Sequence, residues 1–209
     1  MKKYKTLPLL VMVTLFIAGC TSGKTGDKNV SNKTTTYAEG TGYFNKNNED
    51  VTKTLQLSFK EVTDLKKTDI EEARDFQTSL KNGSVIMFSK KDGKELEVYN
   101  ISMMDKFIDS FNSGKEGYVR IIKGSLQDDG KFLVNKLEEY ETDGKIIKDT
   151  GYDTYSDKNK FIPGQSMYFP KIAKTSSDNG VRYAILESKD TPVDMGTTVI
   201  SFDKSSVKN

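Results

Sequence analysis

The sequence predicts an α+β domain in which an antiparallel sheet, a meander, packs against one or two helices. Two observations predict this fold class. An apolar stripe at helical spacing occupies residues 102–113, and strand-like runs separated by short turns rich in Asp and Gly follow it. Short turns favour antiparallel neighbours, and an amphipathic helix needs an apolar sheet face on which to bury its stripe.

The helix at 102–113 has the clearest pattern. Its apolar residues recur at i, i+3, i+4 and i+7, and they are Met104, Phe107, Ile108 and Phe111. Ser102 with Asp105 predicts an N-terminal cap, and Gly114 marks the end of the helix. An earlier segment at 70–80 also has helical spacing, with Thr68 and Glu71 as a possible capping box.

Strands are predicted at 52–62, 84–88, 96–101, 118–123, 132–141, 146–155, 167–172, 181–187 and 193–202. The first of these alternates Leu55, Leu57 and Phe59 with polar residues, which is typical of a half-buried strand. Turns are predicted at 92–93, 128–130 and 143–144, where Asp precedes Gly. Residues 37–209 form one predicted domain, and the sequence leaves open whether 37–90 is a separate small layer.

The N-terminus has the pattern of an export signal. Lys2, Lys3 and Lys5 precede an apolar run from Leu7 to Ile17 that is short for a membrane span. Ala18 and Gly19 then precede Cys20, in the manner of a bacterial lipobox. We therefore predict a lipoprotein signal peptide at 1–19 and an acyl group such as palmitate on Cys20, which would hold the protein at the outer face of the cell membrane.

The segment after Cys20 is predicted to be a flexible tether that ends at residue 36. Val30 is its one apolar residue between positions 21 and 36, so it cannot bury enough surface to become ordered. As a coil it would span ~22 Å root-mean-square. Removal of residues 1–19 takes away three lysines and no acids, which changes the net charge from +2 to −1. A charge near zero gives no general attraction to nucleic acid.

Composition excludes several reaction classes. The chain has no His and one Cys, so it cannot form a Ser-His-Asp triad, a Cys-His pair, a CxxC redox pair or a thiolate zinc site. It also has no phosphate-binding loop and no dinucleotide fingerprint. We therefore predict no catalytic residues, no metal and no cofactor.

A polar segment near the end of the 146–155 strand is the best candidate for a binding surface. It contains Tyr152, Asp153, Tyr155 and Asp157, which could bind a cation, a glycan or a peptide. The alternative is a strand end whose Asp side chains cap turns. On a continuous strand the two Asp residues would share a face.

Charged residues in the neighbouring strands are the other candidates. Arg120 points away from the face of Val119 and Ile121, so it either pairs with a Glu across the sheet or holds an anionic ligand. Glu138 and Glu139 point to opposite faces. A solvated strand face is the expected setting for these two residues and for Glu141.

Five short motifs resemble, in order, a domain-of-unknown-function family of lipoproteins from Gram-positive, mostly spore-forming bacteria. The motifs are Met104–Ile108, Val119–Ile122, Leu137–Tyr140, Asp143–Lys145 and Tyr152–Lys158, within about residues 96–161. The family's turn after the second motif differs from residues 123–130 here. The resemblance implies a lipid-anchored extracytoplasmic domain, and it implies no activity.

Together these observations predict a non-enzymatic lipoprotein whose domain binds an envelope protein or a cell-wall component. No nucleic-acid partner is predicted. The alternative is a carboxylate-dependent hydrolase of a cell-wall polymer, which would need Asp153 and Asp157 to join a third acid in a pocket.

Overall fold

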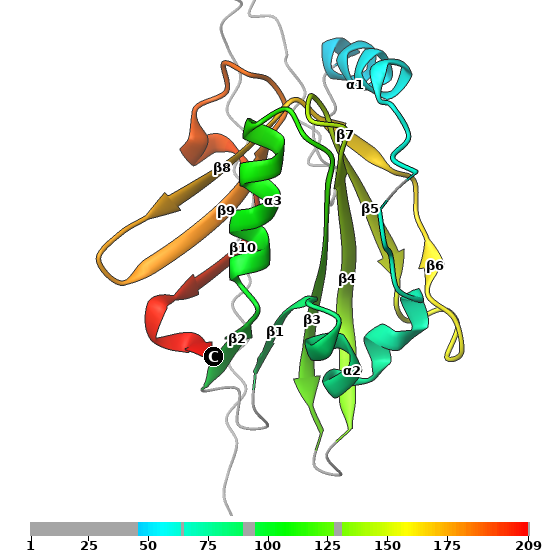
Figure 1. Ribbon diagram of the computed structural model, residues 1–209, viewed down its shortest axis with the longest axis vertical. Helices are drawn as coiled ribbons and strands as arrows, with labels where there is room; N and C mark the ends of the chain where they lie inside the picture. The colour runs from blue at the N-terminus through cyan, green and yellow to red at the C-terminus, as the bar shows by residue number, and fades with distance from the viewer. Residues whose placement is uncertain (1–45, 64, 90–94, 128–130, 209) are drawn as a thin grey trace, which may run out of the picture. The chain divides into compact units, whose positions relative to one another are not determined.

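The computed structural model describes residues 46–63, 65–89, 95–127 and 131–208 (Figure 1). The chain divides into two compact units, residues 1–42 and 43–209, and all described residues belong to the second unit. The predicted signal peptide, Cys20, the tether and the predicted turns at 92–93 and 128–130 lie outside the described residues.

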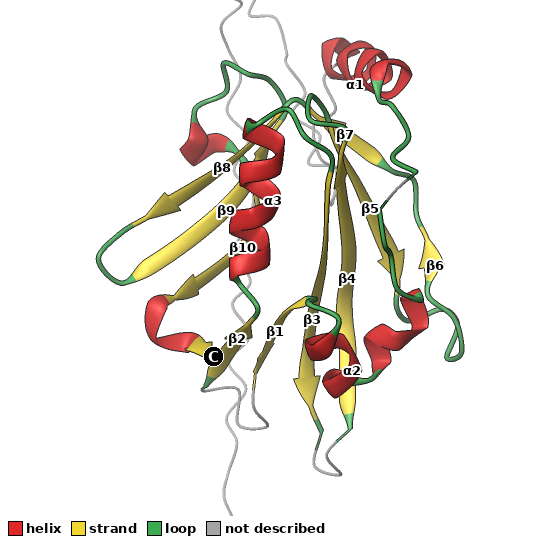
Figure 2. Ribbon diagram, in the orientation of Figure 1, coloured by secondary structure: helices red, strands yellow, loops and turns green. Residues whose placement is uncertain are grey.

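The described chain contains three α-helices, three short 3-10 helices and eleven strands (Figure 2). The helical segments are α1 (Lys46–Ser58), η1 (Ile70–Arg74), α2 (Phe76–Lys81), α3 (Ser102–Asn112), η2 (Val193–Met195) and η3 (Lys204–Ser206). The strands are β1 (Val85–Ser89), β2 (Leu96–Tyr99), β3 (Gly117–Leu126), β4 (Phe132–Thr142), β5 (Ile147–Asp153), β6 (Ile162–Pro163), β7 (Met167–Phe169), β8 (Lys171–Ser176), β9 (Gly180–Leu186), β10 (Thr197–Asp203) and β11 (Val207–Lys208).

The strands form two sheets rather than one meander. Eight strands form a mixed sheet in the order β11-β2-β1-β3-β4-β5-β6, with β7 also paired to β5, and the other three form a sheet in the order β10-β9-β8. The β3-β4-β5 meander is confirmed, but β1 pairs with β3 in parallel and β11 pairs with β2 in parallel. The α+β class is therefore broadly right and the single antiparallel sheet is wrong. The large sheet is mixed because the chain passes through α3 after the β1-β2 hairpin, and this crossover brings β3 beside β1 in the same direction.

The large sheet is buried on both faces. Its α3 face, which includes Val119, Ile121 and Tyr140, packs against α3 and the three-stranded sheet through residues such as Phe107 and Ile200. Figure 1 shows α3 between the three-stranded sheet and β3. The opposite face contacts residues 59–63 and 65–82, and we call it the α2 face. Ile86, Ile122 and Leu137 of this face pack there with Ala73 and Phe76.

The predicted strand at 52–62 is wrong, because residues 46–58 form α1. The alternation of Leu55, Leu57 and Phe59 competes with a second pattern, in which Val51, Leu55 and Phe59 recur every four residues along one side of a helix. The helical pattern prevails: Phe59 packs edge-on against the Tyr168 ring at 5.6 Å, and Leu57 is 80% exposed.

Both predicted N-terminal caps are also wrong. The helical segment at 70–80 is divided at Asp75, whose carboxylate accepts a hydrogen bond from the Thr78 amide at 2.7 Å and begins α2. The cap of η1 is Asp69 rather than Thr68. α3 begins after Ile101, whose side chain has no acceptor for a cap hydrogen bond. The carboxylate of Asp105 accepts from the Tyr183 hydroxyl and from Nζ of Lys174.

Candidate functional site

Arg120 is buried on the α2 face, where it is held by Glu139 and by the segment that covers this face. Its Nε and Nη2 donate to Oε1 of Glu139 at 3.0 and 2.9 Å. Its Nη1 donates to the Thr68 hydroxyl and the Asp69 carbonyl, and Nη2 also donates to the Thr68 carbonyl. All five guanidinium hydrogens therefore have acceptors. The predicted pair with a Glu across the sheet is confirmed, and it also fixes residues 68–69 to the sheet.

Two tyrosines complete this arrangement around Glu139. The Tyr118 hydroxyl donates to Oε1, and the Tyr152 hydroxyl donates to Oε2 at 2.8 Å. Burial, followed by the charge of Glu139, raises the pKa of Tyr118, and burial with the Glu139 hydrogen bond raises the pKa of Tyr152. Both hydroxyls consequently stay protonated as donors. Of the predicted surface residues, the structure brings Tyr152 and Arg120 together, through Glu139.

The other predicted surface residues serve the turn after β5. The Asp153 carboxylate accepts from the amides of Tyr155 and Ser156 at 2.8 and 3.0 Å, and from the Ser156 hydroxyl. Asp157 accepts from the Asn159 amide at 2.7 Å. These contacts match the turn-capping alternative. The chain leaves the strand at Asp153, so the two Asp residues do not share a strand face.

The expectation of a solvated face for the three glutamates of β4 is wrong, since Glu138, Glu139 and Glu141 are all at least 90% buried. Glu138 and Glu139 do lie on opposite faces, as predicted. Glu141 pairs with Lys67 at 2.7 Å on the α2 face. The sequence could not show their burial, because it comes from residues 59–63 and 65–82 and from the three-stranded sheet.

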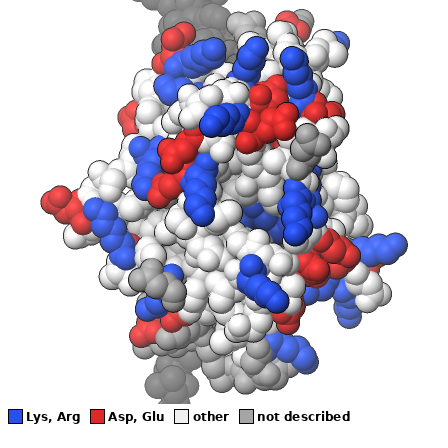
Figure 3. Space-filling view, in the orientation of Figure 1, with Lys and Arg blue, Asp and Glu red and all other residues white. Residues whose placement is uncertain are grey.

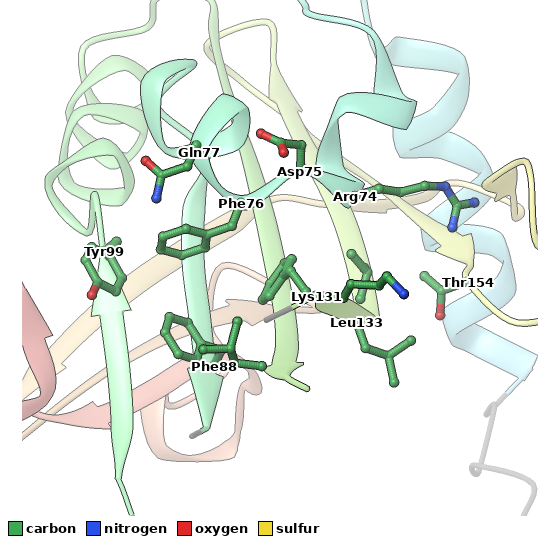
Figure 4. Close-up of a pocket in the computed structure, with 12 residues that line it drawn as sticks. Arg74, Asp75, Phe76, Gln77, Phe88, Tyr99, Lys131, Leu133 and Thr154 are labelled. Carbon is green, nitrogen blue, oxygen red and sulfur yellow. The ribbon is translucent and has the colours of Figure 1, made fainter. Parts of the chain in front are cut away.

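A groove of about 690 Å³ opens at the edge of the α2 face, and it is the candidate binding site (Figure 4). Four aromatic rings from α2, β1, β2 and β4 line it, with centroids 5.4 to 6.1 Å apart. They are Phe76, Phe88, Tyr99 and Phe132. The volume lies in the range of small-ligand sites.

The two ends of the groove differ in chemistry. Figure 4 shows Phe76, Phe88 and Tyr99 on one side, and Arg74, Lys131 and Thr154 on the other. Thr154 belongs to the predicted 152–157 surface, so that segment borders the groove although neither of its Asp residues lines it.

The rim of the groove is apolar and exposed to solvent. Leu126 and Leu133 line it with 37% and 48% of their surface exposed. Sequence reasoning missed this groove, because its aromatic residues come from separate segments and share no spacing. The one signal in the sequence was the pair of large apolar residues, Leu126 and Leu133, on either side of the predicted 128–130 turn.

The α3 face holds a second polar cluster that the sequence analysis also missed. Glu138 pairs with Lys136 at 2.7 Å through Oε1, but its buried Oε2 has no hydrogen-bond partner. Asp149 is 4% exposed, and its Oδ1 is likewise unpartnered. Burial, followed by the charge of Glu138, raises the pKa of Asp149 to about 7.

Charge on the surface is mixed, and no described group is arranged for a metal ion. The face in Figure 3 interleaves lysines and arginines with acids, without a field of one sign. Within the described ranges, no three acidic or Cys side chains are grouped to hold a metal. None of the described helices has both the length and the apolar character needed to cross a membrane.

Searches of family models, curated proteins and solved structures found no match to this chain.

Proposed function

We propose that this protein is a lipid-anchored extracytoplasmic lipoprotein, without enzymatic activity, that binds a peptide segment of an envelope partner in the groove on its α2 face. The observation that carries the proposal is the open groove of about 690 Å³ with an aromatic lining and an exposed apolar rim. Exposed apolar surface of this kind is typical of a binding site.

The anchor rests on the N-terminal sequence. A basic start, a short apolar run and small residues precede Cys20, which is the only Cys in the chain. The polar tether that follows would let the domain stand clear of the lipid headgroups. The resemblance to Gram-positive lipoproteins points the same way.

The chemistry of the groove favours an apolar or aromatic side chain next to a carboxylate. The ring edges and faces of Phe76, Phe88 and Phe132 offer contacts for an apolar group. Arg74 and Lys131 place positive charge at the other end. The one acid in the lining, Asp75, accepts the α2 cap hydrogen bond.

The alternative function, hydrolysis of a wall polymer, receives less support from the geometry. Asp153 is exposed and Asp157 is half-buried, and their carboxylates accept hydrogen bonds from their own turns. Neither lines the groove. A hydrolase would need its acids to face the scissile bond.

The groove is tested by crosslinking on intact cells, with the full-length chain carrying a C-terminal tag as bait. Leu133→Glu places a charge on the rim, and Leu57→Glu is the matched control, because Leu57 is exposed on α1. We expect a specific partner that wild type and Leu57→Glu capture and that Leu133→Glu loses at least tenfold. Equal capture by Leu133→Glu would refute binding in the groove.

A defined probe tests the ligand chemistry directly. A short peptide ending in Phe with a free carboxylate should bind the full-length chain more tightly than the same peptide with a C-terminal amide. Lys131→Gln should reduce that preference. If the two peptides bind equally well, the carboxylate component of the proposal is wrong.

The anchor is tested separately with Cys20→Ser. We expect wild type to incorporate a palmitate analogue and to sediment with membranes, and the variant to do neither. A variant that keeps the label would overturn the assignment of Cys20.

A further inference from the structure

The two sheets meet at a bulge in β10. Pairing between β10 and β9 shifts register between Thr198 and Ile200, which leaves Val199 as the extra residue. The carbonyl of Val199 accepts a hydrogen bond from Nζ of Lys123, on β3 of the large sheet. A lysine of one sheet thus satisfies a backbone group at an irregular point of the other.

The acid pair lies on the same face as Lys123. Glu138 pairs across β4-β5 with Gly151, and Asp149 pairs with Tyr140, so the two carboxyl groups occupy diagonal positions on neighbouring strands. Both residues are more than 90% buried, and each has one oxygen without a hydrogen-bond partner. Two fully ionised carboxylates are costly in such a place.

Tyr140 lies on the same face, directly opposite Asp149 and two residues from Glu138. Burial, followed by the charges of Asp149 and Glu138, raises the pKa of its hydroxyl, so the phenol stays protonated. A phenol has one hydrogen to donate, so it can serve one carboxylate at a time. Each acid moreover has a buried oxygen without a hydrogen-bond partner, and a proton on one carboxyl group would give the pair a donor. The arrangement therefore accommodates one proton on the pair better than none.

The neighbouring groups define the charge balance. The titratable groups are Lys123 from β3 and Lys136, Glu138 and Tyr140 from β4. The residues opposite Lys123 and Asp149 on the neighbouring strands are the uncharged Met87 and Met167. The three-stranded sheet contributes the Val199 carbonyl of β10. Burial lowers the pKa of Lys123, and burial with the charge of Glu138 raises the pKa of Asp149. The same face of the sheet therefore contains an ammonium group, Lys123, whose charge is costly to bury, and a carboxyl group, Asp149, that resists ionisation.

We propose that Asp149 and Glu138 share one proton, and that this proton determines whether Lys123 holds the three-stranded sheet at Val199. With the proton present, Lys123 donates to the Val199 carbonyl. When Asp149 releases the proton to solvent, its new carboxylate attracts the Lys123 ammonium, the Val199 carbonyl loses its donor, and β10 loosens. This device goes beyond the proposed function and is independent of it.

The test uses the full-length chain with isotope labels. Carboxyl ¹³C shifts of Asp149 are followed from pH 4 to 9, together with hydrogen exchange of the β10 amides corrected for intrinsic exchange. We expect Asp149 to titrate near pH 7. The protection of β10 should fall by up to about tenfold per pH unit as the pH rises toward that midpoint, and it should level off above it. Asp149→Asn should remove this pH dependence, and Asp157→Asn, at an exposed turn, should leave it unchanged.

Two outcomes would overturn the proposal. One is titration of Asp149 below pH 5 in the wild-type chain, a measurement that requires no variant to fold. The other is the same pH dependence of β10 protection in Asp149→Asn as in wild type. Lys123→Met provides a further check, since β10 protection should then be low at every pH.

Discussion

Glu138 and Glu139 are adjacent in β4 and almost equally buried, yet their hydrogen bonding differs. On the α2 face, Glu139 accepts from Arg120, Tyr118 and Tyr152, so both of its oxygens are used. On the α3 face, Glu138 has one unpartnered oxygen. The difference arises from the neighbouring strands, because the partners of Glu139 are polar side chains of β3 and β5, whereas Glu138 lies opposite Ile121 and Gly151, which have no polar side chain.

The comparison shows that burial of a carboxylate does not by itself decide its role. A buried charge with a full set of partners acts as a fixed attachment between elements. A buried carboxyl group without a full set of hydrogen-bond partners has a raised pKa, so its protonation becomes sensitive to pH near neutrality. The same strand of this protein contains both cases.

Arg120→Met should have the largest effect, because it leaves Glu139 buried without its cation. We expect a loss of about 3–5 kcal/mol in the free energy of unfolding, measured by urea denaturation at pH 7. Adding Glu139→Gln to the same chain should restore part of the loss. A decrease below about 1 kcal/mol in the single variant would contradict the role given to this pair.

The pH dependence of stability tests the other face. The folded-state pKa of Asp149, about 7, lies above the unfolded value, so its contribution is complete at low pH and is lost as pH rises through 7. Between pH 6 and 8 the free energy of unfolding should fall by about 1.4 kcal/mol. Urea denaturation at both pH values measures this, and Asp149→Asn should remove the difference.

Thr68→Val should have a smaller effect. It removes one acceptor of Arg120 Nη1 and leaves the Asp69 carbonyl in place. We expect a loss of about 1 kcal/mol in urea denaturation. Thr63→Val, at an exposed site, is the matched control and should change little. Equal losses in both variants would mean that the Thr68 contact is not what fixes this segment.

Asp153→Asn should have the smallest effect, limited to the turn after β5. The Ser156 hydroxyl and the amides of Tyr155 and Ser156 lower the pKa of Asp153. Its contribution is therefore present at neutral pH and lost as pH falls through the folded pKa. A small decrease in Tm at pH 7 that disappears near pH 3 is expected. A large decrease would indicate a structural role beyond the turn.

The sequence predicted the elements with a repeated local pattern. The stripe of Met104, Phe107, Ile108 and Phe111 identified α3, and the turn chemistry identified the β3-β4-β5 meander. It failed where two periods overlap, as at Leu55 and Leu57 in α1. The groove could not be predicted, because Phe76, Phe88 and Phe132 meet only after β1 is placed beside β3.

By itself, the sequence determined that the chain lacks His-based chemistry, a CxxC redox pair and a thiolate zinc site, that strands follow a helix, and that Arg120 points away from Val119 and Ile121. These conclusions depend on composition and on periods of two or 3.6 residues, which are local properties of the chain. Only the tertiary structure decided that Arg120 meets Glu139 and that Glu138 lies beside Asp149. Sheet register and the layers that cover each face set the partners, burial and pKa of these groups, and they depend on contacts between residues far apart in the sequence.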